Sequence, residues 1–188
     1  GYDSLRPGQQ ELMEGILQGK DVLGIMPTGA GKSLCYQVPA LMLDGITLVI
    51  SPLISLMSDQ VKALNQAGVH AAYINSSLTE NQIRTALSYA ANGRYKIIYV
   101  ASERLNTMRF LDFACHANIS MVTVDEAHCI SQWGQDFRPS YLEIAGFLAK
   151  LPERPIVSAF TATATERVKQ DITGSLHLQN PVTVVTGF

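Results

Sequence analysis

Residues 21–33 contain the pattern that most restricts how this chain can fold. An apolar run over residues 21–25 leads into Met-Pro-Thr-Gly-Ala-Gly-Lys-Ser over residues 26–33. This pattern predicts a buried strand that turns through glycines into a helix, with backbone N–H groups directed at phosphate oxygens. We therefore expect a nucleotide-binding loop made of Thr28, Gly29, Ala30, Gly31, Lys32 and Ser33.

Two side chains of this loop have separate expected roles. Lys32 would reach the β- and γ-phosphates of ATP, and Ser33 would ligate Mg²⁺. Met26 stands where the strict Gly-x₄-Gly-Lys-Ser pattern has its first glycine. A solvated surface lysine is the alternative, but a strand before the loop and a helix after it favour nucleotide binding.

A second chemical site follows the apolar strand predicted over residues 119–124. It begins with Asp125 and Glu126 and includes His128. Asp125 would hold Mg²⁺ through a water molecule, and Glu126 would orient and deprotonate the attacking water. His128 would lie near the γ-phosphate, or else be a structural histidine. A solvated acidic turn is the alternative for the two acids, but the loop upstream favours hydrolysis of a nucleoside triphosphate.

Strands and helices alternate along the chain. Strands are predicted over residues 21–25, 47–51, 71–74, 97–100, 119–124, 156–160 and 182–185. Helices are predicted over residues 4–17, 32–43, 53–67, 79–91, 109–116, 139–151 and 165–175, with a capping box at Thr79 and Gln82. Apolar strands between helices indicate an α/β fold whose parallel sheet is covered on both faces. Ligands of such sheets bind beyond the carboxyl ends of the strands, where Gly29, Asp125 and Thr161 fall.

The composition restricts the class of protein further. The 188 residues are 47% hydrophobic and 16% charged, which is typical of one globular domain. No apolar run has the length of a membrane span, so we expect no membrane partner. The net charge of −2 argues against a broad basic surface, so any nucleic-acid contact requires a local patch. The spacing of Cys35, Cys115 and Cys129 predicts reduced thiols.

Two segments near helix starts are candidate binding sites. The Gln9 amide would pair with the edge of adenine, and Tyr2 would stack on the base, although the segment also reads as an ordinary helix start. At Ser51, Pro52 and Leu53, a hydroxyl and free amides at a helix N-terminus suit a nucleic-acid phosphate. The same residues suit an ordinary helix cap equally well.

Two loops complete the set of candidates. The loop over residues 131–139 holds Trp133, Phe137 and Arg138, which would stack on bases or anchor the loop in the core. Thr161 and Thr163 follow a strand near the rim of the sheet. They would relay the nucleotide state to the nucleic-acid side, or cap the next helix.

Together these segments resemble the first motor lobe of the RecQ family of superfamily 2 helicases. The resemblance rests on four segments in order: residues 5–9, 26–37, 51–60 and 125–139. It implies a RecA-like P-loop three-layer sandwich with a mostly parallel sheet. It also implies ATP- and Mg²⁺-driven 3′ to 5′ unwinding of DNA in repair and recombination, with single-stranded and partial duplex DNA as partners.

The family pattern also assigns individual residues. Tyr2, Arg6 and Gln9 would hold adenine, while Trp133, Phe137 and Arg138 would sense single-stranded DNA and couple it to hydrolysis. Three positions depart from the pattern: Leu5 replaces an aromatic residue, Gln135 a histidine and Ser102 a proline.

The resemblance further implies a second motor lobe beyond Phe188, which would supply an arginine finger worth roughly 10³–10⁵ in rate. We therefore expect this chain alone to bind nucleotide weakly and to hydrolyse almost none. The protein would act at the bacterial nucleoid in the cytoplasm, or in the nucleus of a eukaryote. The alternatives are a nucleotide-switched binding module without unwinding activity and, less favoured, a small P-loop kinase.

Overall fold

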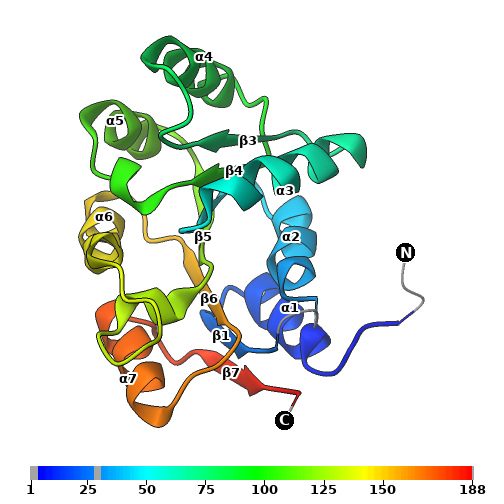
Figure 1. Cartoon of the computed structure of the whole chain (residues 1–188). Coiled ribbons are helices and arrows are strands. Elements are labelled where there is room, and N and C mark those ends of the chain that lie inside the picture. Colours follow the sequence, from blue (N-terminus) through cyan, green and yellow to red (C-terminus); the bar gives the residue numbers. More distant parts are fainter. Residues whose placement is uncertain (1–3, 28–30, 188) are drawn as a thin grey trace.

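The computed structural model describes residues 4–27 and 31–187, and within them seven strands form one parallel sheet (Figure 1). The order across the sheet is β3-β4-β2-β5-β6-β1-β7, and every pairing is parallel. The strands are β1 (Val22–Ile25), β2 (Ile46–Ile50), β3 (Ala71–Ile74), β4 (Ile97–Val100), β5 (Ile119–Val124), β6 (Ile156–Thr161) and β7 (Val182–Val185). The predicted α/β class is confirmed.

Helices cover both faces of this sheet, which gives three layers (Figure 1). One face carries α1 (Gln9–Leu17), α2 (Lys32–Met42) and α3 (Ile54–Gln66). The other face carries α4 (Glu80–Ala91), α5 (Met108–His116), α6 (Ile144–Lys150) and α7 (Glu166–Ser175). Short 3₁₀ helices lie at η1 (Ser102–Arg104), η2 (Ala127–Ile130) and η3 (Pro139–Glu143).

Alternate side chains of the inner strands pack into two separate cores. On β1, Leu23 and Ile25 join the core beneath α4 to α7, whereas Val22 joins the core beneath α1 to α3. On β5, Val122 and Met121 divide between the two cores in the same way. Because strands buried on both faces need apolar residues at successive positions, the continuous apolar runs of the sequence are explained.

The strand order places four loops next to one another. Strands β2, β5, β6 and β1 are neighbours, so their carboxyl ends lie together at one edge of the sheet. Ladder bonds continue past the strand ends: the Asp125 N–H donates to the Ile50 carbonyl at 2.9 Å, and the Met26 N–H to the Thr161 carbonyl at 3.0 Å. The fold therefore assembles the predicted site residues from segments far apart in sequence.

Two predicted helices differ from the observed ones by more than one residue at an end. The first begins at Gln9 rather than at residue 4, because Gly8 adopts a left-handed φ of 86° and Pro7 precedes it. The helix predicted over residues 139–151 divides into η3 and α6.

The capping box at Thr79 is confirmed, with the Gln82 N–H donating to Thr79 Oγ1 at 3.1 Å. Among the described residues, no helix is long and apolar enough to cross a membrane.

Candidate nucleotide site and adjoining loop

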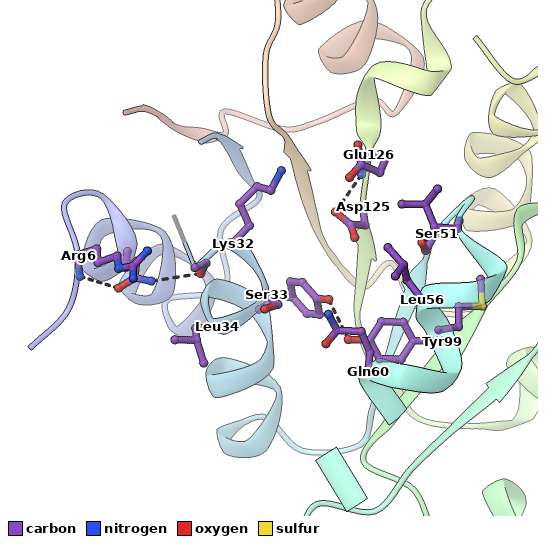
Figure 2. A pocket seen from close by; sticks show the side chains of 15 residues that line it. Arg6, Lys32, Ser33, Leu34, Ser51, Leu56, Gln60, Tyr99, Asp125 and Glu126 are labelled. Atoms are coloured by element: carbon purple, nitrogen blue, oxygen red, sulfur yellow. Dashed lines mark hydrogen bonds between the residues drawn. The ribbon is translucent and has the colours of Figure 1, made fainter. Parts of the chain in front are cut away.

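A cavity of about 480 Å³ lies at the carboxyl edge of the sheet (Figure 2). Its polar lining includes Arg6, Gln9, Lys32, Ser33, Ser51, Gln60, Tyr99, Asp125 and Glu126. Figure 2 shows Lys32 extending from α2 toward the wall that holds Asp125 and Glu126. The predicted convergence of the loop lysine and the two acids is thus present in one cavity.

Gly31 is the N-cap of α2 and has a left-handed backbone that favours glycine. Its φ is 78°, and a Cβ placed there would lie 2.3 Å from Gln9 Nε2. Lys32 and Ser33 follow as the first residues of the helix, where backbone N–H groups lack partners within the helix. Thr28, Gly29 and Ala30 lie outside the described residues, so the contacts predicted for them stay predictions.

Gln9, the first residue of α1, hydrogen-bonds to the loop at Gly31. Its side chain is only 2% exposed; Oε1 accepts from the Arg6 N–H at 2.6 Å, and Nε2 donates to the Gly31 carbonyl at 3.2 Å. The amide therefore supports the nucleotide loop, a role that the sequence did not suggest. Its pairing with adenine stays a prediction, as does that of Arg6, and Tyr2 lies outside the described residues.

Asp125 and Glu126 place two carboxylates side by side at the end of β5. The Glu126 N–H donates to Asp125 Oδ1 at 3.0 Å. Burial, together with the charge of Glu126, raises the pKa of the Asp125 carboxyl to about 6, against the opposing effects of the Glu126 N–H and the Lys32 ammonium. A half-buried acid pair opposite a lysine suits a bound cation and a phosphate chain.

Glu126 has an unusual backbone for a residue other than glycine. Its φ of 51° and ψ of 46° are in the left-handed region. Such conformations cost of order 1–3 kcal/mol and persist where the surroundings fix them. Here the Glu126 carbonyl accepts from the Cys129 N–H at 3.0 Å, while its carboxylate lies 3.6 Å from His128 Nδ1. The turn thus directs the carboxylate of Glu126 to the cavity.

His128 is connected to the neighbouring strand through Thr161. His128 Nδ1 lies 2.7 Å from Thr161 Oγ1, and that hydroxyl donates to the Thr163 carbonyl at 3.2 Å. Because the hydroxyl proton is engaged, Nδ1–H is the donor in the His128 contact. Thr161 is fully buried and links β6 to the acidic turn, and Thr165, rather than Thr161 or Thr163, caps α7.

The segment at Ser51, Pro52 and Leu53 also faces the cavity. Ser51 is buried, and its Oγ accepts from the Leu53 N–H at 3.2 Å. The hydroxyl therefore serves as a turn cap, and Ser51 and Leu53 line the cavity. A contact between this segment and a nucleic-acid phosphate stays a prediction.

The aromatic loop leaves the acidic turn directly. Trp133 is 67% exposed, so it does not anchor the loop in the core. Phe137 and Arg138 are half-buried, and Arg138 pairs within the loop with Asp136 Oδ2 at 3.1 Å. The exposed indole is thus available to a binding partner.

Two buried tyrosines that sequence reasoning missed support the site. Tyr141 donates from its hydroxyl to the Asp125 carbonyl at 2.8 Å. Tyr99 contacts the Tyr36 hydroxyl at 2.9 Å and accepts from Gln37 Nε2, which joins β4 to α2. Tyr99 and Tyr141 are distant in sequence from the residues they contact, and no local pattern marks these two tyrosines.

The geometry agrees with a family match over most of the chain. The family model described as DEAD/DEAH box helicase matches residues 6–172. The chain belongs to the DEAD/DEAH box helicase family. The match spans the loop at Lys32, the acids at Asp125 and Glu126, and the aromatic loop.

Individual helicases of this family are similar over the whole chain. The chain is 49% identical over 189 residues to the ATP-dependent DNA helicase RecQ of Bacillus subtilis, covering 100% of this chain and 32% of that protein. It is 42% identical to the ATP-dependent helicase SGS1 of Saccharomyces cerevisiae, covering 97% of this chain and 13% of that protein. The predicted resemblance to RecQ helicases is confirmed, and the chain spans about a third or less of these relatives.

Solved helicase structures share the fold. The Pyrococcus furiosus Hef helicase domain superposes with a TM-score of 0.73 at 17% identity, over 96% of this chain and 38% of that one. A structure titled as a hypothetical ATP-dependent RNA helicase from Sulfolobus tokodaii gives a TM-score of 0.74 at 20% identity, over 98% and 54%. These matches confirm the predicted RecA-like sandwich.

Proposed function

We propose that this chain is the nucleotide-binding lobe of an ATP-dependent 3′ to 5′ DNA helicase that acts in DNA repair and recombination. The observation that carries the proposal is the single cavity shared by Lys32, Ser33, Asp125 and Glu126. The name of the Bacillus subtilis relative, an ATP-dependent DNA helicase, supports DNA as the polymer on which the whole protein acts.

Each residue of the cavity has a proposed part in hydrolysis. Lys32 stabilises the negative charge of the β- and γ-phosphates, and its charge is already directed at the acidic wall. Glu126 accepts a proton from the attacking water, and its left-handed turn fixes the carboxylate. The Nδ1–H of His128 donates to Thr161 Oγ1, and Nδ1 lies 3.6 Å from the Glu126 carboxylate, so His128 holds the acidic turn against β6.

The donor set suits Mg²⁺. Mg²⁺ prefers oxygen ligands and usually combines one or two protein groups with phosphates and water. Ser33 and Asp125 offer a hydroxyl and a half-buried carboxylate in one cavity. Desolvation and the adjacent charge of Glu126 raise the pKa of Asp125, and a bound cation would oppose that shift. When bound, the ion would polarise the phosphate oxygens and orient them for attack.

A second lobe in a longer polypeptide would complete the ATP site from the opposite side. The relatives are about three or more times longer than this chain, which supports such a partner. We also propose the cellular places expected from the family, the bacterial nucleoid or the eukaryotic nucleus. A nucleotide-switched binding module would share the cavity, but would not need water-activating Glu126.

Trp133→Ala in a polypeptide that carries both lobes tests the DNA part of the proposal. The exposed indole is expected to stack on a base, so the variant should keep basal hydrolysis but lose most stimulation by single-stranded DNA. Met108→Ala, which truncates an exposed apolar side chain on α5, is the matched control. Unchanged stimulation in the Trp133 variant would contradict the proposal, and DNA-stimulated turnover by this chain alone would remove the need for a second lobe.

A further inference from the structure

The segment between the acidic turn and the aromatic loop is fixed at both ends by β6 and α7. At one end, Thr161 Oγ1 contacts His128 Nδ1 at 2.7 Å. At the other, Ser131 Oγ donates to Asp171 Oδ2 at 2.6 Å. The η2 turn is therefore held by β6 at His128 and by α7 at Ser131, and β6 and α7 follow each other directly in the chain.

Asp171 reaches Trp133 through Ser131. The Ser131 hydroxyl is buried and, while donating to Asp171, accepts from the Trp133 N–H at 3.1 Å. A chain of two hydrogen bonds thus fixes the backbone of Trp133 relative to α7. Gly134 adds to this arrangement, because a Cβ there would lie 2.7 Å from the His128 carbonyl oxygen.

Arg167 covers one face of the exposed indole. Its guanidinium carbon lies 5.2 Å from the Trp133 ring centre, within cation–π range, and its Nε lies 3.5 Å from Asp171 Oδ1. The carboxylate of Asp171 therefore orients both the backbone and the ring of Trp133. Since the indole remains 67% exposed with one face backed by Arg167, the rest of the ring is open to a partner.

We propose that Arg167 and Asp171 on α7 are positioning residues, which hold Trp133 so that its open face receives a base of single-stranded DNA. The inference rests on the proposed function for the identity of the partner, but the positioning itself is independent of it. Because Arg167 already orients the indole, the Trp133 side chain loses less conformational entropy when a base stacks on it.

Trp133 is the only tryptophan of the chain, so its fluorescence reports on the loop directly. In the 188-residue chain without DNA, both Arg167→Ala and Asp171→Ala should raise the acrylamide quenching constant of Trp133. For Arg167→Ala the increase should be about twofold, because this variant uncovers the second face of the ring. Lys169→Ala, which breaks an exposed pair with Glu166 on the same helix, should leave quenching unchanged. Equal quenching in all four proteins would overturn the positioning.

Affinity for fluorescein-labelled oligo(dT) then separates positioning from simple charge. Asp171→Ala removes a negative charge, so electrostatics alone predicts tighter binding. The proposal predicts severalfold weaker binding, with partial rescue in Asp171→Asn, which keeps an acceptor for Ser131. Tighter binding by Asp171→Ala would overturn the proposal. If the wild-type chain bound no oligo(dT) while quenching responded as expected, the DNA function would fail and the positioning would stand.

Discussion

Asp125 holds a carboxylate where its surroundings oppose ionisation. Burial and the adjacent Glu126 raise its pKa to about 6, above the ordinary value of 3.8. The folded chain therefore binds a proton at this site more tightly than the unfolded chain does. The protonated Asp125 carboxyl therefore makes its full contribution to the free energy of unfolding below pH 4, and this contribution is lost as the pH rises through 6. The proposed nucleotide site thus carries a cost in stability at neutral pH in the absence of a cation.

Asp125→Asn should raise the stability of the ligand-free chain at neutral pH. Removing the buried charge is expected to increase the free energy of unfolding by about 1–3 kcal/mol at pH 7.5, with the gain vanishing below pH 4. Urea unfolding at several pH values measures this difference. A gain that stays constant from pH 4 to 7.5 would show that ionisation is not the cause.

The three cysteines should differ in reactivity, because the thiolate is the reactive form. Burial raises the pKa of the Cys35 thiol to about 11 and, with Asp136, that of Cys129 to about 12, whereas Cys115 is partly exposed. We expect a maleimide at pH 8 to label one thiol in the native chain and three after denaturation, counted by mass spectrometry. Rapid labelling of Cys35 or Cys129 would contradict their burial.

At the scale of elements, Asp21 joins three segments at the amino end of the sheet. Its oxygens accept from Arg154 at 2.6 and 3.0 Å, from the Val157 N–H at 3.0 Å and from the Gln179 N–H at 2.8 Å. The carboxylate is 2% exposed. One side chain thus connects the start of β1 with the start of β6 and the turn before β7.

Asp21→Ala should destabilise the chain strongly. It leaves the Arg154 guanidinium and two backbone N–H groups without this acceptor, at an expected cost of about 3–5 kcal/mol. Lys169→Ala, which removes an exposed pair on α7, should cost less than about 1 kcal/mol. Thermal and urea unfolding compare the two, and similar small losses would show that the Asp21 contacts contribute little.

The sequence predicted the bounds of helices and strands better than it predicted the tertiary contacts between them. Strands β3, β4, β5 and β7 match the predicted ranges, since apolar runs that end in turns mark both strand ends. The start of α1 was wrong because Gly8 turns the backbone, an effect that helical periodicity does not register. Pairs such as Arg154 with Asp21 depend on strand order, and no local pattern in the sequence encodes which strands become neighbours.

For the site, motif residues were placed well and their supporting residues were not. Lys32, Ser33, Asp125 and Glu126 share one cavity, as expected from loops at the carboxyl ends of parallel strands. The partners that orient the site, among them Tyr141, lie in segments without a motif. Their roles require the tertiary structure.

For the molecule as a whole, the proposed function requires a triphosphate bound between α2 and the end of β5. Lys32 lies on one wall of that cavity and packs little against the core, so its truncation should spare the fold. Losing a charge-assisted contact to phosphate is expected to weaken binding roughly tenfold to a hundredfold.

Isothermal titration of Mg·ATP into the wild-type chain, Lys32→Ala and a surface control, Lys62→Ala on α3, measures this directly. We expect one binding site in the wild type and the control, and severely weakened binding in Lys32→Ala at an unchanged unfolding midpoint. Wild-type affinity in a folded Lys32→Ala chain would contradict the proposed function.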